Sequence, residues 1–340
     1  MHPPHPLSPA PVAPDRRRWL AALPPLVALA ATSGASRAWA QGAFPQRPVK
    51  FIVPNAPGSS IDTIARILST QMAQGLTQPL VVDNKAGAAG ALGVEVGRTA
   101  PADGHTVIIA SSSAITIAPL LQKAVPYDPL KDFDFISLIA LLPNVLVVNP
   151  ALPVRNVAEL IAYAKSKGNS SNMASAGVGS TSHLAGAALQ AAGGFQSLHV
   201  PYKGGAQGVT SVVAGETDWV LTPAPAAMGQ VQTGRLRLLA HSMTTESRPL
   251  GDVPSIAQTL PGFEFAGWIG LMAPKGLPPG AVDTLRRALA QALQQPELRK
   301  QFDTNGAVPT PSTPQEFRAF LARDIEVHKK AIEVAGVKAE

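Results

Sequence analysis

The sequence predicts an α/β protein of two lobes that hold a small anionic ligand between them. Short apolar runs alternate with helical patterns along most of the chain, which is typical of parallel sheets covered by helices on both faces. The roughly 300 residues that follow an N-terminal leader are long for one hydrophobic core and comfortable for two. A glycine- and serine-rich loop stands before an apolar helix in each half of the chain, at Pro54–Ser60 and at Gly177–Ser182.

The composition is that of a well-buried globular protein. Hydrophobic residues make up 46% of the chain and charged residues 15%, so disorder is not expected. The absence of cysteine excludes disulfides, thiol chemistry, cysteine-ligated metals and a lipidated N-terminal cysteine. The formal net charge is +6, but no block of basic residues with interleaved aromatics follows the leader. Nucleic acid is therefore not an expected partner, and no cofactor is expected.

Residues 1–40 have the pattern of an export signal peptide. Three arginines, at positions 16–18, precede the apolar run Leu20–Ala31, and Ala38-Trp39-Ala40 fits an A-x-A cleavage site. An uncleaved anchor is disfavoured, because the run is shorter than the about 20 residues that span a bilayer and Pro24-Pro25 interrupts it. Sec and twin-arginine export both remain open. After cleavage we expect a soluble, monomeric periplasmic protein.

The stretch Val49–Arg66 carries the strongest indication of a binding site. A buried strand is expected over Val49–Val53, followed by the loop and by an amphipathic helix over Ile61–Gln74. Ser59 and Asp62 stand in the S-x-x-D spacing of a capping box. Asp62 is expected to cap the helix and order the loop, since an acid aimed into an anion site would repel the ligand. Free N–H groups and the helix dipole favour an anion at this point.

The second loop, at Gly177–Ser182, repeats this arrangement before a helix over Ser182–Ala192. Gly179, Ser180 and Thr181 are its expected contacts with the ligand. His183 lies in the first turn of that helix, where the positive end of the dipole should keep it neutral, and it is expected to orient the helix.

Polar residues follow two further strands. Ser111, Ser112 and Ser113 come after the strand Thr106–Ala110, and ligands of open α/β sheets bind at such carboxyl ends. Tyr202 and Lys203 come after the strand Leu198–Val200. Lys203 is either a countercharge for the ligand or a solvated residue at the rim.

The other expected elements complete the alternation. Two apolar segments, Leu141–Pro150 and Phe263–Pro274, are expected to cross between the lobes. The boundaries are then 41–143 plus 266–340 for lobe 1 and 144–265 for lobe 2, and the charged, amphipathic segment Thr313–Glu340 packs on lobe 1. Strands are predicted at Leu80–Val82, Val145–Val148, Trp219–Leu221, Leu236–Ala240 and Gly267–Met272, and helices at Val157–Ser166, Ala206–Ala214 and Pro279–Gln294.

Seven segments together resemble one family, the Bug-type receptors, which are periplasmic solute-binding proteins of the tripartite tricarboxylate transporter family. The resemblance runs from about Pro48 to the C-terminus, and the order of the segments makes it specific. The segments are IVPNAPGSSIDTIAR (52–66), VVDNKAGAAGALG (81–93), PADGHTVIIASSS (101–113), YDPLKDFDFISL (127–138), SAGVGSTSHLAG (175–186), VPYKGG (200–205) and WIGLMAPKGLP (268–278).

This resemblance implies a fold similar to the type II periplasmic binding proteins, in which two α/β lobes joined by two crossing strands close over the ligand like a Venus flytrap. It further implies a small carboxylate ligand, partly held through water by the first loop, and multi-span membrane transporter subunits as partners. The predicted ligand-binding residues are Asn55, Ala56, Pro57, Gly58, Ser59, Ser60, Ser111, Ser112, Ser113, Ser175, Gly179, Ser180, Thr181, Tyr202 and Thr222. Asp62, His183 and Lys203 are predicted to be structural residues near the cleft.

Several positions depart from the family pattern. Asn55 stands where relatives carry an aromatic residue, and it can donate and accept hydrogen bonds. Ser59 replaces a glycine, so the backbone there must avoid strongly positive φ. Lys85-Ala86 replaces Arg-Pro. Thr222 replaces an aspartate that would pair with a ligand amine, which favours a carboxylate without an amino group.

A binding protein is favoured over an exported hydrolase. The sequence has no G-x-S-x-G, S-x-x-K or H-E-x-x-H motif. Neither His183 nor His199 has a second ligand at metal-binding spacing, and His105 and His241 are isolated. Ser180 and His183 are three residues apart, but no third orienting acid is apparent. A receptor that signals to a membrane sensor kinase remains an alternative to transport, because both roles need closure that depends on the ligand.

Overall fold

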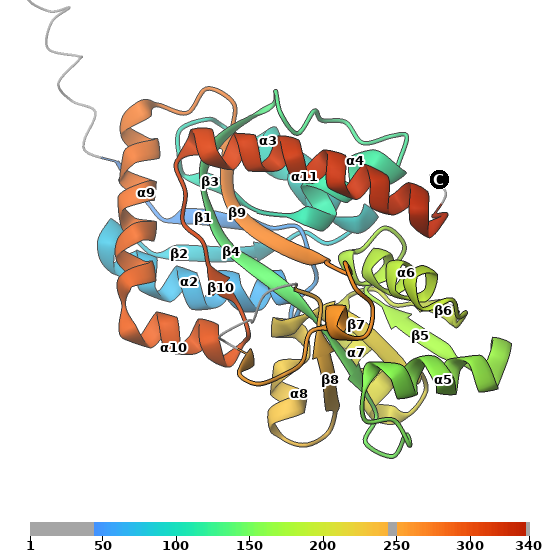
Figure 1. The fold of residues 1–340 in the computed structure, drawn as a ribbon. Helices are drawn as coiled ribbons and strands as arrows, with labels where there is room; N and C mark the ends of the chain where they lie inside the picture. Colours follow the sequence, from blue (N-terminus) through green and yellow to red (C-terminus); the bar gives the residue numbers. More distant parts are fainter. Residues whose placement is uncertain (1–43, 244–249, 338–340) are drawn as a thin grey trace, which may run out of the picture. The chain divides into compact units, whose positions relative to one another are not determined.

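The computed structural model describes residues 44–243 and 250–337, all within the compact unit Phe44–Glu340. The predicted signal peptide and its cleavage site lie outside the described residues, as does the end of the C-terminal segment, 338–340. Within the described residues, two α/β lobes are built around one continuous, curled set of strands, in the order β2-β1-β3-β9-β4-β7-β5-β6 (Figure 1).

The first lobe has a mixed sheet. Strands β2 (Leu80–Asn84), β1 (Val49–Val53) and β3 (Thr106–Ser111) pair in parallel, as predicted. The next strand, β9 (Ala266–Pro274), runs antiparallel to β3 and to β4 (Phe133–Val148). The prediction of parallel sheets holds for these three strands and is wrong for β9 and β4, because both antiparallel strands belong to segments that cross between the lobes.

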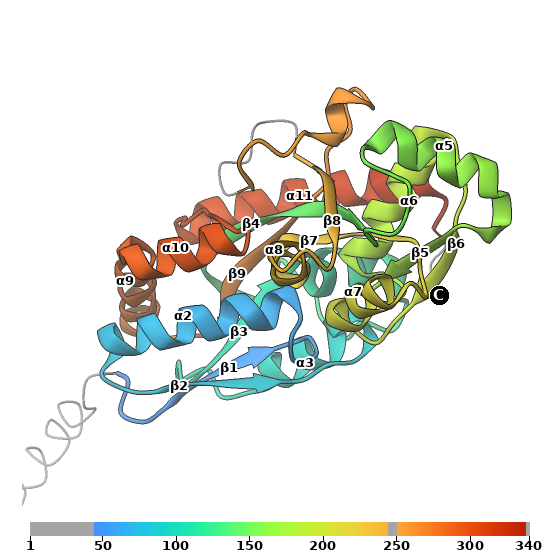
Figure 2. The ribbon, with the colours of Figure 1, turned by 90° about the horizontal axis from the view of Figure 1, so that it is seen from below.

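Helices cover both faces of this sheet (Figures 1 and 2). On one face α2 (Ser60–Leu76), α9 (Pro279–Gln294) and α10 (Pro296–Thr304) share a core with the alternate strand residues Phe51, Val107 and Ile109. On the other face α3 (Ala91–Arg98) and the start of α11 (Pro314–Ala335) pack on Ile108 and Ala110. The period-two alternation of β3 thus supplies both cores.

Strand β4 is the crossing segment that the sequence predicted only in part. Its 16 residues are almost continuously buried. It pairs with β9 as far as Pro143, and with β7 (Trp219–Pro223) from Asn144 onward. Asn144 fixes this point, because its N–H donates to Ser242 Oγ (2.9 Å) and its side chain donates to the carbonyl of Phe265 (2.7 Å).

The second lobe extends the sheet through β7, β5 (Asn172–Ser175) and β6 (Leu198–Pro201), with β8 (Arg237–His241) also paired to β4. Strand β5 was not predicted, since its NMAS sequence has little strand character. One face is covered by α5 (Val157–Lys167) and α6 (Thr181–Gly193), and the other by α7 (Gly205–Ala214) and α8 (Met228–Gln232).

Helix α11 contacts both lobes, which corrects the prediction that it packs on lobe 1. Phe317 and Leu321 are buried in the first lobe, whereas Ala331 and Ile332 pack against the core of the second. A helix of 22 residues is about 33 Å long, so it reaches beyond one lobe. Figure 1 shows it running across the top of the fold toward α6.

Short elements fill the connections. They are η1 (Ala88–Gly90), the π-helical turn η2 (Ser112–Ile117), α4 (Ala118–Leu121), η3 (Gly168–Ser170), η4 (Ala224–Ala226), η6 (Ile256–Gln258) and β10 (Val308–Pro309).

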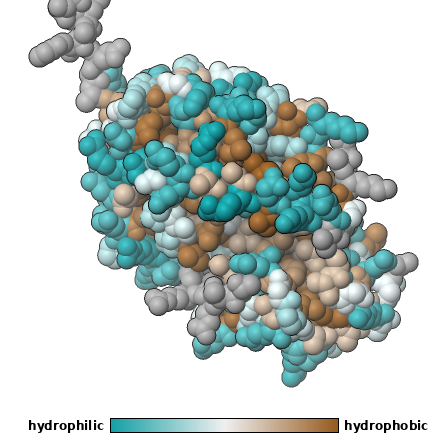
Figure 3. Space-filling model, turned by 45° about the horizontal axis from the view of Figure 1, so that its top comes forward, coloured by the Kyte–Doolittle hydropathy of each residue, from teal (hydrophilic) through white to brown (hydrophobic). Residues whose placement is uncertain are grey.

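The surface is mixed in character. Figure 3 shows hydrophilic residues over much of one face, with hydrophobic side chains in patches between them. Of the helices in residues 44–243 and 250–337, none is both long and apolar enough to cross a membrane.

Candidate functional site

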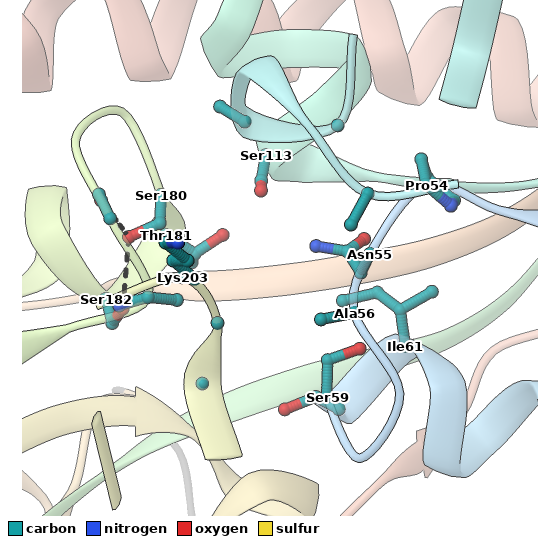
Figure 4. A pocket seen from close by; sticks show the side chains of 18 of the residues that line it. Pro54, Asn55, Ala56, Ser59, Ile61, Ser113, Ser180, Thr181, Ser182 and Lys203 are labelled. Carbon is teal, nitrogen blue, oxygen red and sulfur yellow. Dashed lines mark hydrogen bonds between the residues drawn. The ribbon is translucent and has the colours of Figure 1, made fainter. Parts of the chain in front are cut away.

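A cavity of about 420 Å³ lies between the two lobes. Figure 4 shows residues of the loop after β1 on one side, Ser180–Ser182 on the opposite side, and Ser113 between them. We call it the interlobe cavity. Its lining residues are Pro54, Asn55, Ala56, Ser59, Ser60, Ile61, Ala86, Gly87, Ala88, Ala89, Gly90, Ser113, Ala176, Gly177, Val178, Ser180, Thr181, Ser182, Tyr202, Lys203, Gly204, Gly205, Thr222 and Pro223.

The first-lobe loop, Pro54–Ser60, is ordered by Ser59 and Asp62. Ser59 is the N-cap of α2, with φ −71°, and its hydroxyl accepts from the N–H of Asp62 at 3.3 Å. The Asp62 carboxylate accepts from the N–H of Gly58 at 2.9 Å, one residue earlier than a capping box requires. Its other oxygen accepts from Asn84 Nδ2, which also donates to the carbonyl of Asn55. Asp62 therefore fixes the conformation of the loop through these hydrogen bonds.

Asp62 stays ionised despite its burial. Burial raises the pKa of this carboxyl, but hydrogen bonds from Arg66, Gly58 and Asn84 outweigh it, so the pKa lies below its usual value. The carboxylate does not line the cavity. These contacts agree with the structural role predicted for Asp62.

The second-lobe loop, Ser175–Ser182, is held by a dense set of hydrogen bonds. Ser180 is the N-cap of α6 and accepts from the N–H of His183 at 3.2 Å. Its hydroxyl also bonds the carbonyl of Gly177 at 2.6 Å, while Ser182 Oγ accepts from the N–H of Ala176 at 2.9 Å. The two helix N-termini, of α2 and α6, thus face the same cavity.

Each of these N-termini leaves two backbone N–H groups without an acceptor in the described part of the chain. On α2 they belong to Ser60 and Ile61, and on α6 to Thr181 and Ser182. All four residues line the interlobe cavity. Unpaired N–H groups at a helix N-terminus form an anion site together with the helix dipole.

A third segment, Ala86–Gly90, lines the cavity and was missed by the sequence analysis. Ala88 and Ala89 adopt positive φ of 47° and 51°, a left-handed conformation that is strained for residues with a Cβ. A Cβ on Gly90 would lie 2.7 Å from the Cβ of Ala114 and 3.1 Å from the carbonyl oxygen of Pro54. The glycines at 87, 90 and 93 could have indicated this segment, since glycine lets the backbone approach another part of the chain or a ligand closely.

Among the residues that the structure describes, no carboxylate lines the interlobe cavity, and Lys203 is the single charged side chain of its wall. Lys203 is exposed and forms no ion pair with a described residue. Asn55 Oδ1 is buried without a hydrogen-bond partner within the described residues, and Thr222 is buried in the wall. The electrostatic balance therefore favours an anion, and the described wall offers a ligand amine only neutral acceptors such as Asn55 Oδ1 and no carboxylate.

Nine of the fifteen predicted ligand-binding residues line the cavity, namely Asn55, Ala56, Ser59, Ser60, Ser113, Ser180, Thr181, Tyr202 and Thr222, and Lys203 joins them. Pro57, Gly58, Ser111, Ser112, Ser175 and Gly179 do not.

The hydrogen bonds of these residues explain their exclusion. Ser111 Oγ accepts from Ala114 N, and Ser112 Oγ bonds Thr181 Oγ1 across the lobes at 3.4 Å. Ser175 Oγ and Gly179 N–H bond the rings of His199 and His183. Pro57 and Gly58 lie exposed at the tip of their loop.

Among the residues that the structure describes, no group of three or more His, Asp or Glu side chains is arranged to hold a metal ion.

Comparisons with known proteins point to one family. Residues 64–337 match the family described as tripartite tricarboxylate transporter family receptor. A protein encoded in the tcbD–tcbE intergenic region of a Pseudomonas species is 35% identical over 93% of this chain and 94% of its own length. Protein BugT of Bordetella pertussis is 33% identical over 91% of this chain and 95% of its own.

Solved structures agree with this match. An R. palustris protein solved with adipate has a TM-score of 0.84 and 30% identity, and covers 87% of this chain and 99% of its own. MatC from Rhodopseudomonas palustris, solved with bound malate, has a TM-score of 0.79 and 30% identity, and covers 85% of this chain and 100% of its own.

Proposed function

The chain belongs to the tripartite tricarboxylate transporter family of receptors, and from that premise we propose that its interlobe cavity captures a small carboxylate and delivers it to membrane transporter subunits. Two relatives of the same fold were solved with adipate and with malate, which are both small carboxylates. We further propose that the receptor acts in the periplasm after cleavage of residues 1–40, and that it is a monomer.

One observation supports a carboxylate above other ligands. The cavity receives two pairs of unpaired N–H groups, from Ser60 and Ile61 on one lobe and from Thr181 and Ser182 on the other. Carboxylate oxygens accept such bonds, and charge assistance makes them about twice as strong as neutral ones. Ser113 and Lys203 add a hydroxyl and a positive charge to the same wall.

The ligand is proposed to lack an amino group. An ammonium group would need a carboxylate partner in the cavity, and the wall offers none. Thr222 occupies the place where an aspartate would supply one, and it is buried. Burying an ammonium group without a carboxylate partner costs roughly several kcal/mol. Amino acids should therefore bind far more weakly than the corresponding acids without an amino group.

We propose that binding closes the lobes about the crossing segments, with boundaries at 41–143 plus 266–340 and at 144–265. Small residues allow the lobes to meet. A Cβ placed on Gly204 would lie 3.4 Å from the Cβ of Ala56, and one on Gly58 would lie 3.5 Å from the Cβ of Ala206. A ligand that bridges both N-termini favours this closed arrangement, and such differential binding is required for closure.

Catalysis is not proposed. The hydroxyl of Ser180 bonds the carbonyl of Gly177 and accepts the N–H of His183, while the His183 ring accepts from Gly179. Ser180 and the His183 ring are therefore engaged in capping and turn formation, not in a nucleophile–base pair. Signalling to a membrane kinase remains the second candidate, because the same closure would serve it. Loss of carboxylate uptake on deletion of the gene would favour transport, and unchanged uptake with a lost transcriptional response would favour signalling.

The test is a thermal-shift screen of the purified protein after refolding to remove carried-over ligand. Malate, adipate, tricarboxylates and aromatic acids are compared with glutamate, aspartate and phosphate. A ligand at a hundredfold excess over its Kd should stabilise the fold by about 2.7 kcal/mol. Carboxylates should raise the melting temperature and glutamate should not, and NMR should recover the ligand unchanged. A flat response to all carboxylates, or turnover, contradicts the proposal.

A further inference from the structure

Two histidines lie stacked behind the second-lobe loop. The rings of His183 on α6 and His199 on β6 have centroids 4.1 Å apart, and their planes are within 9° of parallel. Neither ring lines the interlobe cavity. The histidine ion pairs of the described residues involve His105 and His328, so no carboxylate accompanies this stacked pair.

Each ring holds a different turn of the loop. The N–H of Gly179 donates to Nδ1 of His183 at 3.2 Å, so this nitrogen must be unprotonated. Nε2 of His199 bonds Ser175 Oγ at 2.6 Å, and the same hydroxyl accepts from the N–H of Gly177 at 3.0 Å. Both glycines have positive φ, 113° and 72° in chain order. The two turns are therefore fixed by imidazole nitrogens that come from outside the loop.

These turns determine where the cavity wall lies. Ala176, Gly177 and Val178 line the cavity directly. The turn at Gly179 leads into Ser180–Ser182, which carries the unpaired N–H groups of α6. Building on the proposed function, we propose that His183 and His199 are positioning residues for the carboxylate, which hold this loop in its binding shape only while Nδ1 of His183 is unprotonated.

The surroundings of the pair support the pH dependence that follows. Strands β5 and β7 and the turn η2 pack against α6 and contain no titratable side chain. Helix α11 also packs against α6 and carries charged side chains. The pKa of His183 is nevertheless lowered by burial and not by these charges. Burial, followed by the charge on His183, lowers the pKa of His199 to about 4. Both rings are thus neutral at pH 7, and acid would place an Nδ1–H against the N–H of Gly179.

The experiment measures the Kd of malate and adipate by calorimetry at pH 7.5, 6.5 and 5.5, for the wild type and for His183→Asn. Asparagine Oδ1 stands near the place of Nδ1 and accepts the same bond, but it does not titrate. We expect affinities within about threefold at pH 7.5, because the acceptor is kept. As the pH falls to 5.5, the wild type should weaken relative to the variant, since only the wild type loses the acceptor. The loss stays below about tenfold at that pH, because the pKa of His183 lies below its ordinary value of 6.5. The ratio of the two Kd values at each pH cancels the titration of the ligand itself.

Two further variants complete the design. His183→Leu leaves the Gly179 N–H unpaired and should weaken binding about tenfold at pH 7.5. His241→Asn is the matched control, because His241 is also buried, also has a lowered pKa and accepts from Met243 N–H at 3.2 Å, but lies outside the cavity wall. It should keep the pH profile of the wild type.

A constant ratio of wild-type to His183→Asn Kd values across this pH range would overturn the inference. So would a folded His183→Leu variant with unchanged Kd, since a merely structural residue changes the melting temperature alone. Failure of the wild type to bind either acid, or any other carboxylate, would overturn the proposed function and this inference with it.

Discussion

Replacing Asp62 by asparagine tests whether this buried carboxylate builds the binding loop. Gly58 N–H and Arg66 Nε both donate to one oxygen, and Asn84 Nδ2 donates to the other, each at 2.9 Å. Asparagine keeps a single oxygen. If that oxygen accepts the bonds from Gly58 and Arg66, the new NH2 group of residue 62 faces the NH2 group of Asn84. Both groups are donors, so no hydrogen bond forms between them.

The magnitude follows from these three contacts. The Arg66 side chain is 54% exposed, so its ion pair is screened by water and contributes less than about 1 kcal/mol. The lost bond from Asn84 to a buried charged group contributes about 1.5–3 kcal/mol. We expect Asp62→Asn to lower the free energy of unfolding by about 2–3 kcal/mol, and the melting temperature by about 3–5 °C for a unit of this size.

The effect on binding is the more informative readout. Asn84 Nδ2 also donates to the carbonyl of Asn55 at 3.0 Å, so an Asn84 amide that turns away from position 62 releases Asn55 as well. We expect the Kd of malate or adipate to rise about tenfold, which corresponds to about 1.4 kcal/mol. Calorimetry at pH 7.5 measures the Kd, and circular dichroism follows the melting temperature.

Asp134→Asn is the matched control. Asp134 also accepts three hydrogen bonds, two from the backbone N–H groups of Gly276 and Leu277 and one from the cation Lys275, but it does not line the cavity. It should lower the melting temperature by a similar amount and leave the Kd unchanged. Tighter binding by Asp62→Asn would refute the reasoning, because it would show that the acid repels the ligand. An unchanged Kd with a lowered melting temperature would show that Asp62 does not shape the loop.

Three other substitutions give clear expectations. Gly58→Leu should weaken carboxylate binding at least about tenfold, because a side chain at this position meets Ala206, and wild-type affinity would contradict closure at this point. It should also lower the free energy of unfolding by about 1–2 kcal/mol, because Gly58 has a φ of 77°. Asn144→Ala should lower the free energy of unfolding by about 1–2 kcal/mol in urea titrations through loss of its bond to Phe265, and no change would show that this bond contributes nothing. Burial lowers the pKa of His328, but Asp324 outweighs it and the pKa is raised. The stabilisation of the fold by protonated His328 is full below pH 6.5 and is lost as the pH rises through the raised pKa. His328→Gln should therefore lower the melting temperature more at pH 6 than at pH 8.5. A larger loss at pH 8.5 would contradict the raised pKa.

The sequence alone determined the elements whose signals are local. The strand Val49–Val53 and the helix Pro279–Gln294 match the predicted bounds, since apolar periodicity and a proline at the helix start depend only on neighbouring residues. The N-cap Ser59 follows from the same short-range chemistry, whereas the N-cap Ser180 stands two residues before the predicted helix start. The family was also identified from the sequence, because its segments occur in a fixed order.

Only the tertiary structure decided which polar groups reach the ligand cavity. Ser111 and Ser112 had the same local signal as Ser113, but the hydroxyl of Ser111 caps a turn and that of Ser112 bonds the opposite lobe. The hydroxyl of Ser175, another predicted contact, bonds His199. The Ala86–Gly90 segment contributes only backbone and methyl groups to the cavity wall. Such groups occur throughout the chain, so the residue types alone do not predict that this segment lines the cavity.

The reach of β4 and α11 across both lobes also depends on pairing partners far away in the sequence. Residues 133–148 are mostly apolar, and the pairing with β9 and with β7 decides where one sheet ends and the next begins. Local propensity sets what an element is, whereas long-range packing sets which of its faces meets the ligand.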